Sequence, residues 1–145
     1  METKEESICR PFDAARLRLA EADNFDVQRD ELGNMLHQFF RLVELKGGAE
    51  VLKNEPCAST ALAILLFRHK NTHEITRIAE PADIFIDAFT NSFGALIWNA
   101  PAEVAGDNRF TAWGTDRIVG KPALETTTDA FNQVLALPRH DPGAI

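Results

Sequence analysis

The sequence is poor in cysteine and has no long apolar run. Its two cysteines, Cys9 and Cys57, lie far apart and form no Cys-x-x-Cys unit, which excludes a disulfide-rich miniprotein. Cys57 borders an apolar run and is predicted to be a small buried hydrophobe. That run, residues 61–67, is too short to cross a bilayer, and the acidic first residues do not form a secretory signal. We therefore expect a soluble, cytoplasmic protein with no membrane partner.

Basic runs and the common catalytic signatures are also missing. The chain has 15 Lys and Arg against 22 Asp and Glu, a formal net charge of -7. This excess of negative charge disfavours binding to nucleic acid or to anionic membranes. The sequence contains no Gly-x-Ser-x-Gly, no phosphate-binding Gly-x-x-x-x-Gly-Lys and no Gly-x-Gly-x-x-Gly. These absences favour a protein that is not an enzyme.

The composition is that of an ordinary globular domain. Of the 145 residues, 45% are hydrophobic and 26% are charged, which is enough apolar material for one core. We expect a flexible acidic tail over residues 1–10, a single helical domain over 11–138 and a flexible tail over 139–145.

Helical periodicity dominates the chain. Leu32, Leu36, Phe39 and Val43 recur at helical spacing, and Gly47-Gly48 follows as a stop signal. The same reasoning predicts further helices over 13–22, 71–79, 81–98 and 127–137. The apolar segment 57–68 is interpreted as a helix because alanine and leucine dominate it, with a buried strand as the alternative.

Residues 99–121 have no helical periodicity and are punctuated by glycine and proline. Phe110–Trp113 and Arg117–Val119 flank Gly114-Thr115-Asp116, which predicts a small hairpin. The predicted fold class is therefore mainly α: a compact bundle of about five or six helices with a small β-hairpin or irregular loop near 107–121. An α+β fold, with 57–67 as a strand, is the alternative.

The segment 107–121 is also the first candidate site, through Arg109, Trp113, Asp116 and Arg117. Loops on a helical scaffold often carry binding residues, and Trp and Arg are frequent anchors at protein interfaces. The alternative is a connector whose aromatic residues cover the edge of the core. A second interaction candidate is the acidic face with Asp83 and Asp87, for which the alternative is a charged helix start in contact with water.

A metal site is the third candidate. His69 and His73 are four residues apart, the spacing that puts two imidazoles on one helix face, and Asp83 and Asp87 repeat this spacing. Together they would supply two nitrogen and two carboxylate ligands for a divalent metal, the one cofactor that the sequence suggests. The alternative is that both histidines are surface residues, because Asn71-Thr72 breaks the helix between them.

These observations favour a small acidic protein that acts by binding another protein, as a regulator, adaptor or inhibitor. The partner could equally be a second copy of the chain in a homodimer. The metal site supplies one alternative function, either a metal-dependent enzyme or a metal-binding protein. A binder of a small apolar ligand is the other, because ten Phe and two Trp with no Tyr could line a cavity.

Overall fold

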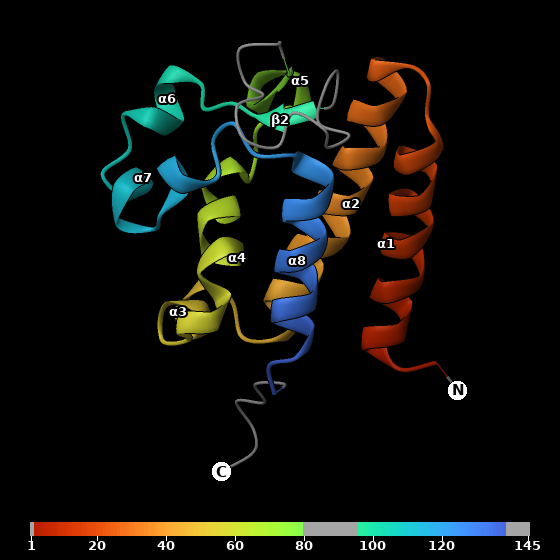
Figure 1. Ribbon diagram of the computed structural model, residues 1–145. Coiled ribbons are helices and arrows are strands. Elements are labelled where there is room, and N and C mark those ends of the chain that lie inside the picture. The colour runs from red at the N-terminus through yellow and green to blue at the C-terminus, as the bar shows by residue number, and fades with distance from the viewer. Residues whose placement is uncertain (1, 80–95, 139–145) are drawn as a thin grey trace.

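The computed structural model describes residues 2–79 and 96–138, which are mostly helical, with one short antiparallel sheet. The fold is mainly α, as predicted. Figure 1 shows α1 at one end of the molecule and the short helices α6 and α7 at the other, with α2, α8 and α4 between them. Within the described ranges, no helix is long and apolar enough to span a membrane.

The first helix, α1, covers Lys4–Glu21. Thr3 and Glu6 form a reciprocal capping box that starts the helix, and Ile8, Phe12, Ala15 and Leu19 form its buried face. The expected acidic tail over 1–10 is therefore wrong from Lys4 onward. The spacing of four, three and four between those buried residues is the helical signal, and it begins before residue 10.

The second helix, α2, covers Phe25–Leu45 and packs against α1 (Figure 1). Asn24 caps its start by accepting hydrogen bonds from the backbone N–H groups of Asp26 and Val27. Gly47 and Gly48 end it at φ values of 115° and 83°, which suit glycine. This helix and its stop are confirmed, as is the buried stripe of Leu32, Leu36, Phe39 and Val43.

The apolar segment after α2 is helical. It contains α3 (Ala49–Lys53), the 3-10 turn η1 (Pro56–Ala58), α4 (Ser59–Ile64) and η2 (Leu65–Phe67), so the helical interpretation is right and the strand alternative is wrong. Cys57, however, is exposed. It belongs to the η1 turn, where Ala58 rather than Cys57 faces the core, so the prediction of a buried cysteine is wrong.

The sheet lies where helices were expected. Helix α5 is only Thr72–Ile75, and β1 (Thr76–Ile78) then pairs antiparallel with β2 (Leu96–Trp98), with Arg77 opposite Ile97. The predicted helix therefore stops at residue 75 instead of 79. The predicted helix over 81–98 is wrong at residues 96–98, and the part before residue 96 lies outside the described residues. Tertiary pairing of these β-branched and aromatic residues overrides local helix preference.

The predicted hairpin over 110–119 is also wrong. The structure has α6 (Ala102–Ala105), α7 (Arg109–Ala112) and the 3-10 turn η4 (Thr115–Arg117). Gly114 has a φ of 76° and separates α7 from η4, and Thr115 is buried with its hydroxyl donating to the carbonyl of Ala63 at 3.3 Å. The segment is therefore two helical turns with a contact to α4, and not a hairpin.

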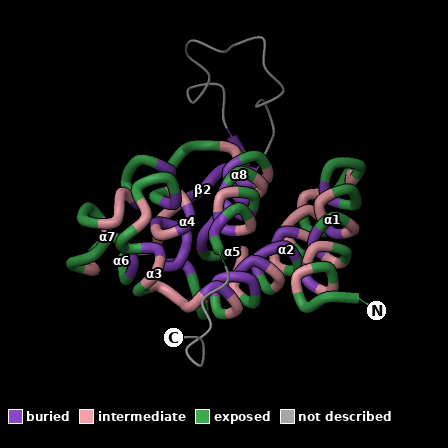
Figure 2. Tube along the Cα trace, turned by 90° about the horizontal axis from the view of Figure 1, so that it is seen from below, coloured by how far each residue is buried: buried purple, intermediate pink, exposed green. Residues whose placement is uncertain are grey.

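The last helix, α8, covers Ala123–Leu135 and packs against α1, α2 and α4. It begins earlier than the predicted 127–137. Figure 2 shows that buried residues concentrate along α2, α4 and α8. Phe131 of α8 stacks on Phe12 of α1 with ring centroids 3.7 Å apart, and Phe67 stacks on Trp98 at 4.8 Å, so aromatic pairs join the elements of one core.

Candidate functional site

Trp113 stands at the end of α7, half-buried, with its ring packed against the hydrophobic core. Its backbone N–H donates to the carbonyl of Arg109 at 2.8 Å, so it closes the helical turn that Arg109 begins. The indole is therefore held against the core, and part of it remains accessible to solvent. Phe110 is also half-buried and packs on the same core.

Two cations lie near the indole of Trp113. The Cζ atom of Arg109 is 5.0 Å from the ring centroid, and the Nζ atom of Lys53, from α3, is 5.6 Å from it. Both distances are in the range of a cation–π interaction, which is favourable because the face of an aromatic ring is electronegative. The tertiary structure thus brings together two helical turns that are far apart in the chain.

Asp107 holds Arg109 in place. Its carboxylate accepts hydrogen bonds from Nε of Arg109 at 2.9 Å and from Nη2 at 2.7 Å, and it also accepts from the Arg109 backbone N–H at 2.8 Å. A bidentate pair of this kind fixes the plane of the guanidinium. Because the side chain and backbone of Arg109 donate to it, the pKa of Asp107 falls to about 2, and the same pair raises the pKa of Arg109.

Arg117 extends the site beyond Gly114. A Cβ atom placed on Gly114 would lie 3.7 Å from Cδ and 3.8 Å from Nη1 of Arg117, so the Arg117 side chain lies over this glycine. Asp116 and Arg117 are both exposed. The structure therefore places Arg109, Trp113, Asp116 and Arg117, all predicted from the sequence, on one short stretch of helical turns. We call Lys53, Arg109, Trp113 and Arg117 the Trp113 surface.

Lys53 is not among the site residues predicted from the sequence. It belongs to a different part of the chain and pairs locally with Glu50 at 3.0 Å, which is an ordinary pattern for an exposed helix. No local signal connects Lys53 with Trp113. Only the packing of the surrounding elements brings the ammonium near the indole.

The histidines of the metal hypothesis do not share a helix face. His69 follows η2 with a φ of 73°, and His73 belongs to the separate helix α5. Asp83 and Asp87 lie outside the described residues. Among the described residues, no group of three or more His, Cys, Asp or Glu side chains could hold a metal ion. The divalent-metal site, like the interaction face at Asp83 and Asp87, stays a prediction.

The apolar-ligand hypothesis also stays a prediction. Phe12, Phe39, Phe67 and Phe131 are buried in the core, and three of them stack on another aromatic ring or on each other. Packing explains these side chains without a ligand. Phe85, Phe89 and Phe93 lie outside the described residues.

No protein-family model matches the chain, and no curated protein or solved structure matches it either. The geometry of the described residues is therefore the only basis for a proposed function.

Proposed function

We propose that this protein acts by binding another protein through the Trp113 surface, as a non-enzymatic regulator, adaptor or inhibitor in the cytoplasm. The observation that carries the proposal is the arrangement of Trp113. Its indole is half-buried and lies near two cations, one of which is held by a bidentate carboxylate.

Tryptophan and arginine are the residues that most often dominate binding energy at protein interfaces. Because the Trp113 ring is already held against the core, it can contribute a large contact area to an interface without losing much conformational freedom on binding. In the same way, Arg109 is already held by Asp107. Association therefore costs less side-chain entropy than it would with free side chains, and that cost normally limits affinity.

The charges around Trp113 indicate the chemistry of the partner. Lys53 pairs with Glu50 and Arg109 pairs with Asp107, so both cations are already partly neutralised. Arg117 is exposed, and no ion pair joins it to a described residue. We expect the partner to cover the indole with an apolar side chain and to place a carboxylate against Arg117. A second copy of the chain is one such partner.

The test compares the binding of three forms of the protein. The wild type, Trp113→Ala and Leu17→Ala are immobilised and exposed to an extract of the source cells, and each form is also analysed by light scattering over a range of concentrations. Leu17 is the matched control because it is 51% exposed and belongs to α1, at the opposite end of the molecule from α7 (Figure 1).

The proposal predicts a bound protein, or a dimer, that the wild type and Leu17→Ala retain. Trp113→Ala should weaken this binding by about thirtyfold or more, as expected for an interface hot spot worth about 2 kcal/mol. Circular dichroism establishes that all three forms are folded. The proposal fails if Trp113→Ala binds as well as the wild type, or if every form is monomeric and captures nothing.

A further inference from the structure

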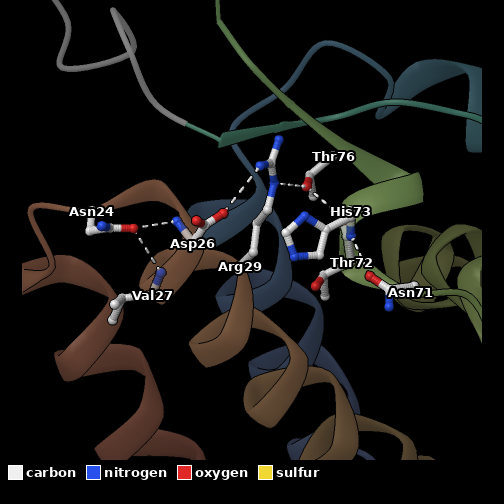
Figure 3. Close-up of polar contacts among 8 residues, drawn as sticks. All are labelled: Asn24, Asp26, Val27, Arg29, Asn71, Thr72, His73 and Thr76. Atoms are coloured by element: carbon white, nitrogen blue, oxygen red, sulfur yellow. Dashed lines mark hydrogen bonds and ion pairs between the residues drawn. The ribbon is translucent and has the colours of Figure 1, made fainter.

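A second cluster of polar groups lies where α2 meets α5 and β1. Figure 3 shows Arg29 rising from the second turn of α2 toward Thr76, the first residue of β1. Nε of Arg29 donates to the Thr76 hydroxyl oxygen at 3.4 Å, and the Thr76 hydroxyl donates in turn to the carbonyl of Thr72. The cluster therefore joins three elements and takes no part in the Trp113 surface.

Close packing of α2 against α5 fixes the position of this cluster. A Cβ atom placed on Gly33 would lie 3.6 Å from Cγ2 of Thr72, so Thr72 packs on the helix one turn after Arg29. Arg29 and Gly33 on one side thus face Thr76 and Thr72 on the other. Arg29 and Gly33 are four residues apart on α2, which is the spacing that puts them on one helix face.

Toward the described residues, the guanidinium of Arg29 uses little of its hydrogen-bonding capacity. Its side chain is only 18% exposed, and a guanidinium has five N–H donors. Among the described residues its partners are the long hydrogen bond to Thr76 and the carboxylate of Asp26, which lies 3.9 Å away and is beyond hydrogen-bond range. The cation is therefore held in place but has room for a better acceptor.

His73 supplies a second group at the same place. Figure 3 shows its imidazole pointing from α5 toward the side chain of Arg29. Its backbone N–H is held by the Asn71 side chain at 2.8 Å, while its imidazole makes no polar contact with a described residue. A neutral imidazole always carries one N–H donor, and a protonated one carries two.

We propose that Arg29 and His73 form a binding site for a small oxyanion, either the carboxylate or the phosphate group of a small molecule. The planar guanidinium matches two oxygens of such a group, and the imidazole N–H donates to it from α5. Asp26 is the competing carboxylate at this place. Its side chain is 77% exposed and can turn toward solvent when the ligand binds.

The test is a titration of the wild-type protein followed by NMR. Sodium phosphate, sodium acetate and sodium chloride are added in separate experiments at constant ionic strength, and the imidazole signals of His73 and the Nε signal of Arg29 are recorded. Saturation with phosphate assigns a phosphate ligand, saturation with acetate assigns a carboxylate, and saturation with both supports the general oxyanion class. Equal, unsaturated shifts with all three salts overturn the proposal.

Four variants make the test specific. Arg29→Gln should weaken binding at least about tenfold, the loss expected when a charge-assisted hydrogen bond is removed. His73→Ala changes an exposed residue, so the fold should be retained, and it should weaken binding about threefold. Asp26→Asn should strengthen binding, because it removes the competing charge. Arg41→Gln, an exposed arginine on the same helix, should change nothing. Unchanged binding in both Arg29→Gln and His73→Ala would also overturn the proposal.

Discussion

Lys46 and Glu5 form an ion pair between the end of α2 and the first turn of α1, with 2.9 Å between Nζ and Oε1. The same ammonium donates to the carbonyl of Leu135 at 3.1 Å and to the carbonyl of Leu137, although Lys46 is only 2% exposed. All three of its N–H donors are therefore used. A cation at carbonyls that end a helix is favourable, so Lys46 ties α1 and α2 to the end of α8.

Replacing Lys46 with methionine should lower the free energy of unfolding by about 3 kcal/mol, because two carbonyls and a carboxylate lose their donor. Urea denaturation measures this change. Glu5→Gln should cost less than about 1 kcal/mol, since the Glu5 side chain is 38% exposed. Lys121→Met, at an exposed lysine outside the Trp113 surface, should stay within about 0.5 kcal/mol of the wild type. If Lys46→Met costs no more than this control, the role assigned to Lys46 is wrong.

Truncation of the two tryptophans should reduce the stability of the protein by very different amounts. Trp98 is fully buried against Phe67, whereas Trp113 is half-buried. Trp98→Ala should destabilise the fold by about 4 kcal/mol and Trp113→Ala by about 1 kcal/mol.

Fluorescence quenching by iodide checks this assignment directly. The chain contains two tryptophans, so Trp98→Phe and Trp113→Phe each leave one. The tryptophan left by Trp98→Phe should be quenched, and the one left by Trp113→Phe should be protected. The reverse order would contradict the arrangement of the Trp113 surface.

The Asp107–Arg109 pair should survive mild acid. The pKa of Asp107 is lowered from 3.8 to about 2, chiefly by the hydrogen bonds from the side chain of Arg109. A carboxyl whose folded-state pKa is lowered contributes its stabilisation above the unfolded-state pKa and loses it as the pH falls through the folded-state value. The pair should therefore be complete above pH 4 and be lost on acidification toward about pH 2.

A carbon NMR titration of the Asp107 carboxyl measures this pKa. In Arg109→Gln the pKa should rise back toward 3.8, because the guanidinium that lowers it is gone. Arg18→Gln, which removes an exposed arginine on α1, provides the control and should leave the Asp107 titration unchanged. A normal pKa in the wild type would show that the guanidinium is not held over Trp113 in solution.

Alanine substitutions at two glycines should change the stability of the protein in opposite directions. Gly33 lies inside α2, and its new Cβ would make an ordinary contact with Thr72, so Gly33→Ala should stabilise the protein by about 0.5–1 kcal/mol. Gly48 has a φ of 83° and a ψ of -170°, a conformation that a Cβ atom opposes, so Gly48→Ala should cost about 1–3 kcal/mol. Thermal unfolding of both variants measures the two effects, and a shared sign would contradict this reading of the backbone.

The sequence predicted the elements whose signals are local. The stripe from Leu32 to Val43 and the Gly47-Gly48 stop depend on residues within a few turns of each other, and the structure confirms both. The same local reasoning found Arg109 and Trp113 together. It did not find Lys53, because a contact between residues far apart in the chain produces no periodic pattern in the sequence.

The errors occur where tertiary contacts outweigh local preference. Residues 76–78 follow a good helix start, yet they become a strand because residues 96–98 lie alongside to pair with them. Residues 110–119 have the turn residues of a hairpin, yet they fold as helical turns, with Thr115 buried and its hydroxyl bonded to Ala63 of α4.

The sequence by itself therefore determined that the chain is mainly helical, where α2 ends and which residues form its buried stripe. These features follow from side-chain spacing and capping, which act over a few residues. Only the tertiary structure decided that Lys53 meets Trp113, that Arg29 meets Thr76 and that Lys46 closes the end of α8. Such contacts depend on how the helices pack together once they have formed. Burial of apolar surface favours the packing of whole helix faces, whatever the order of their residues along the chain.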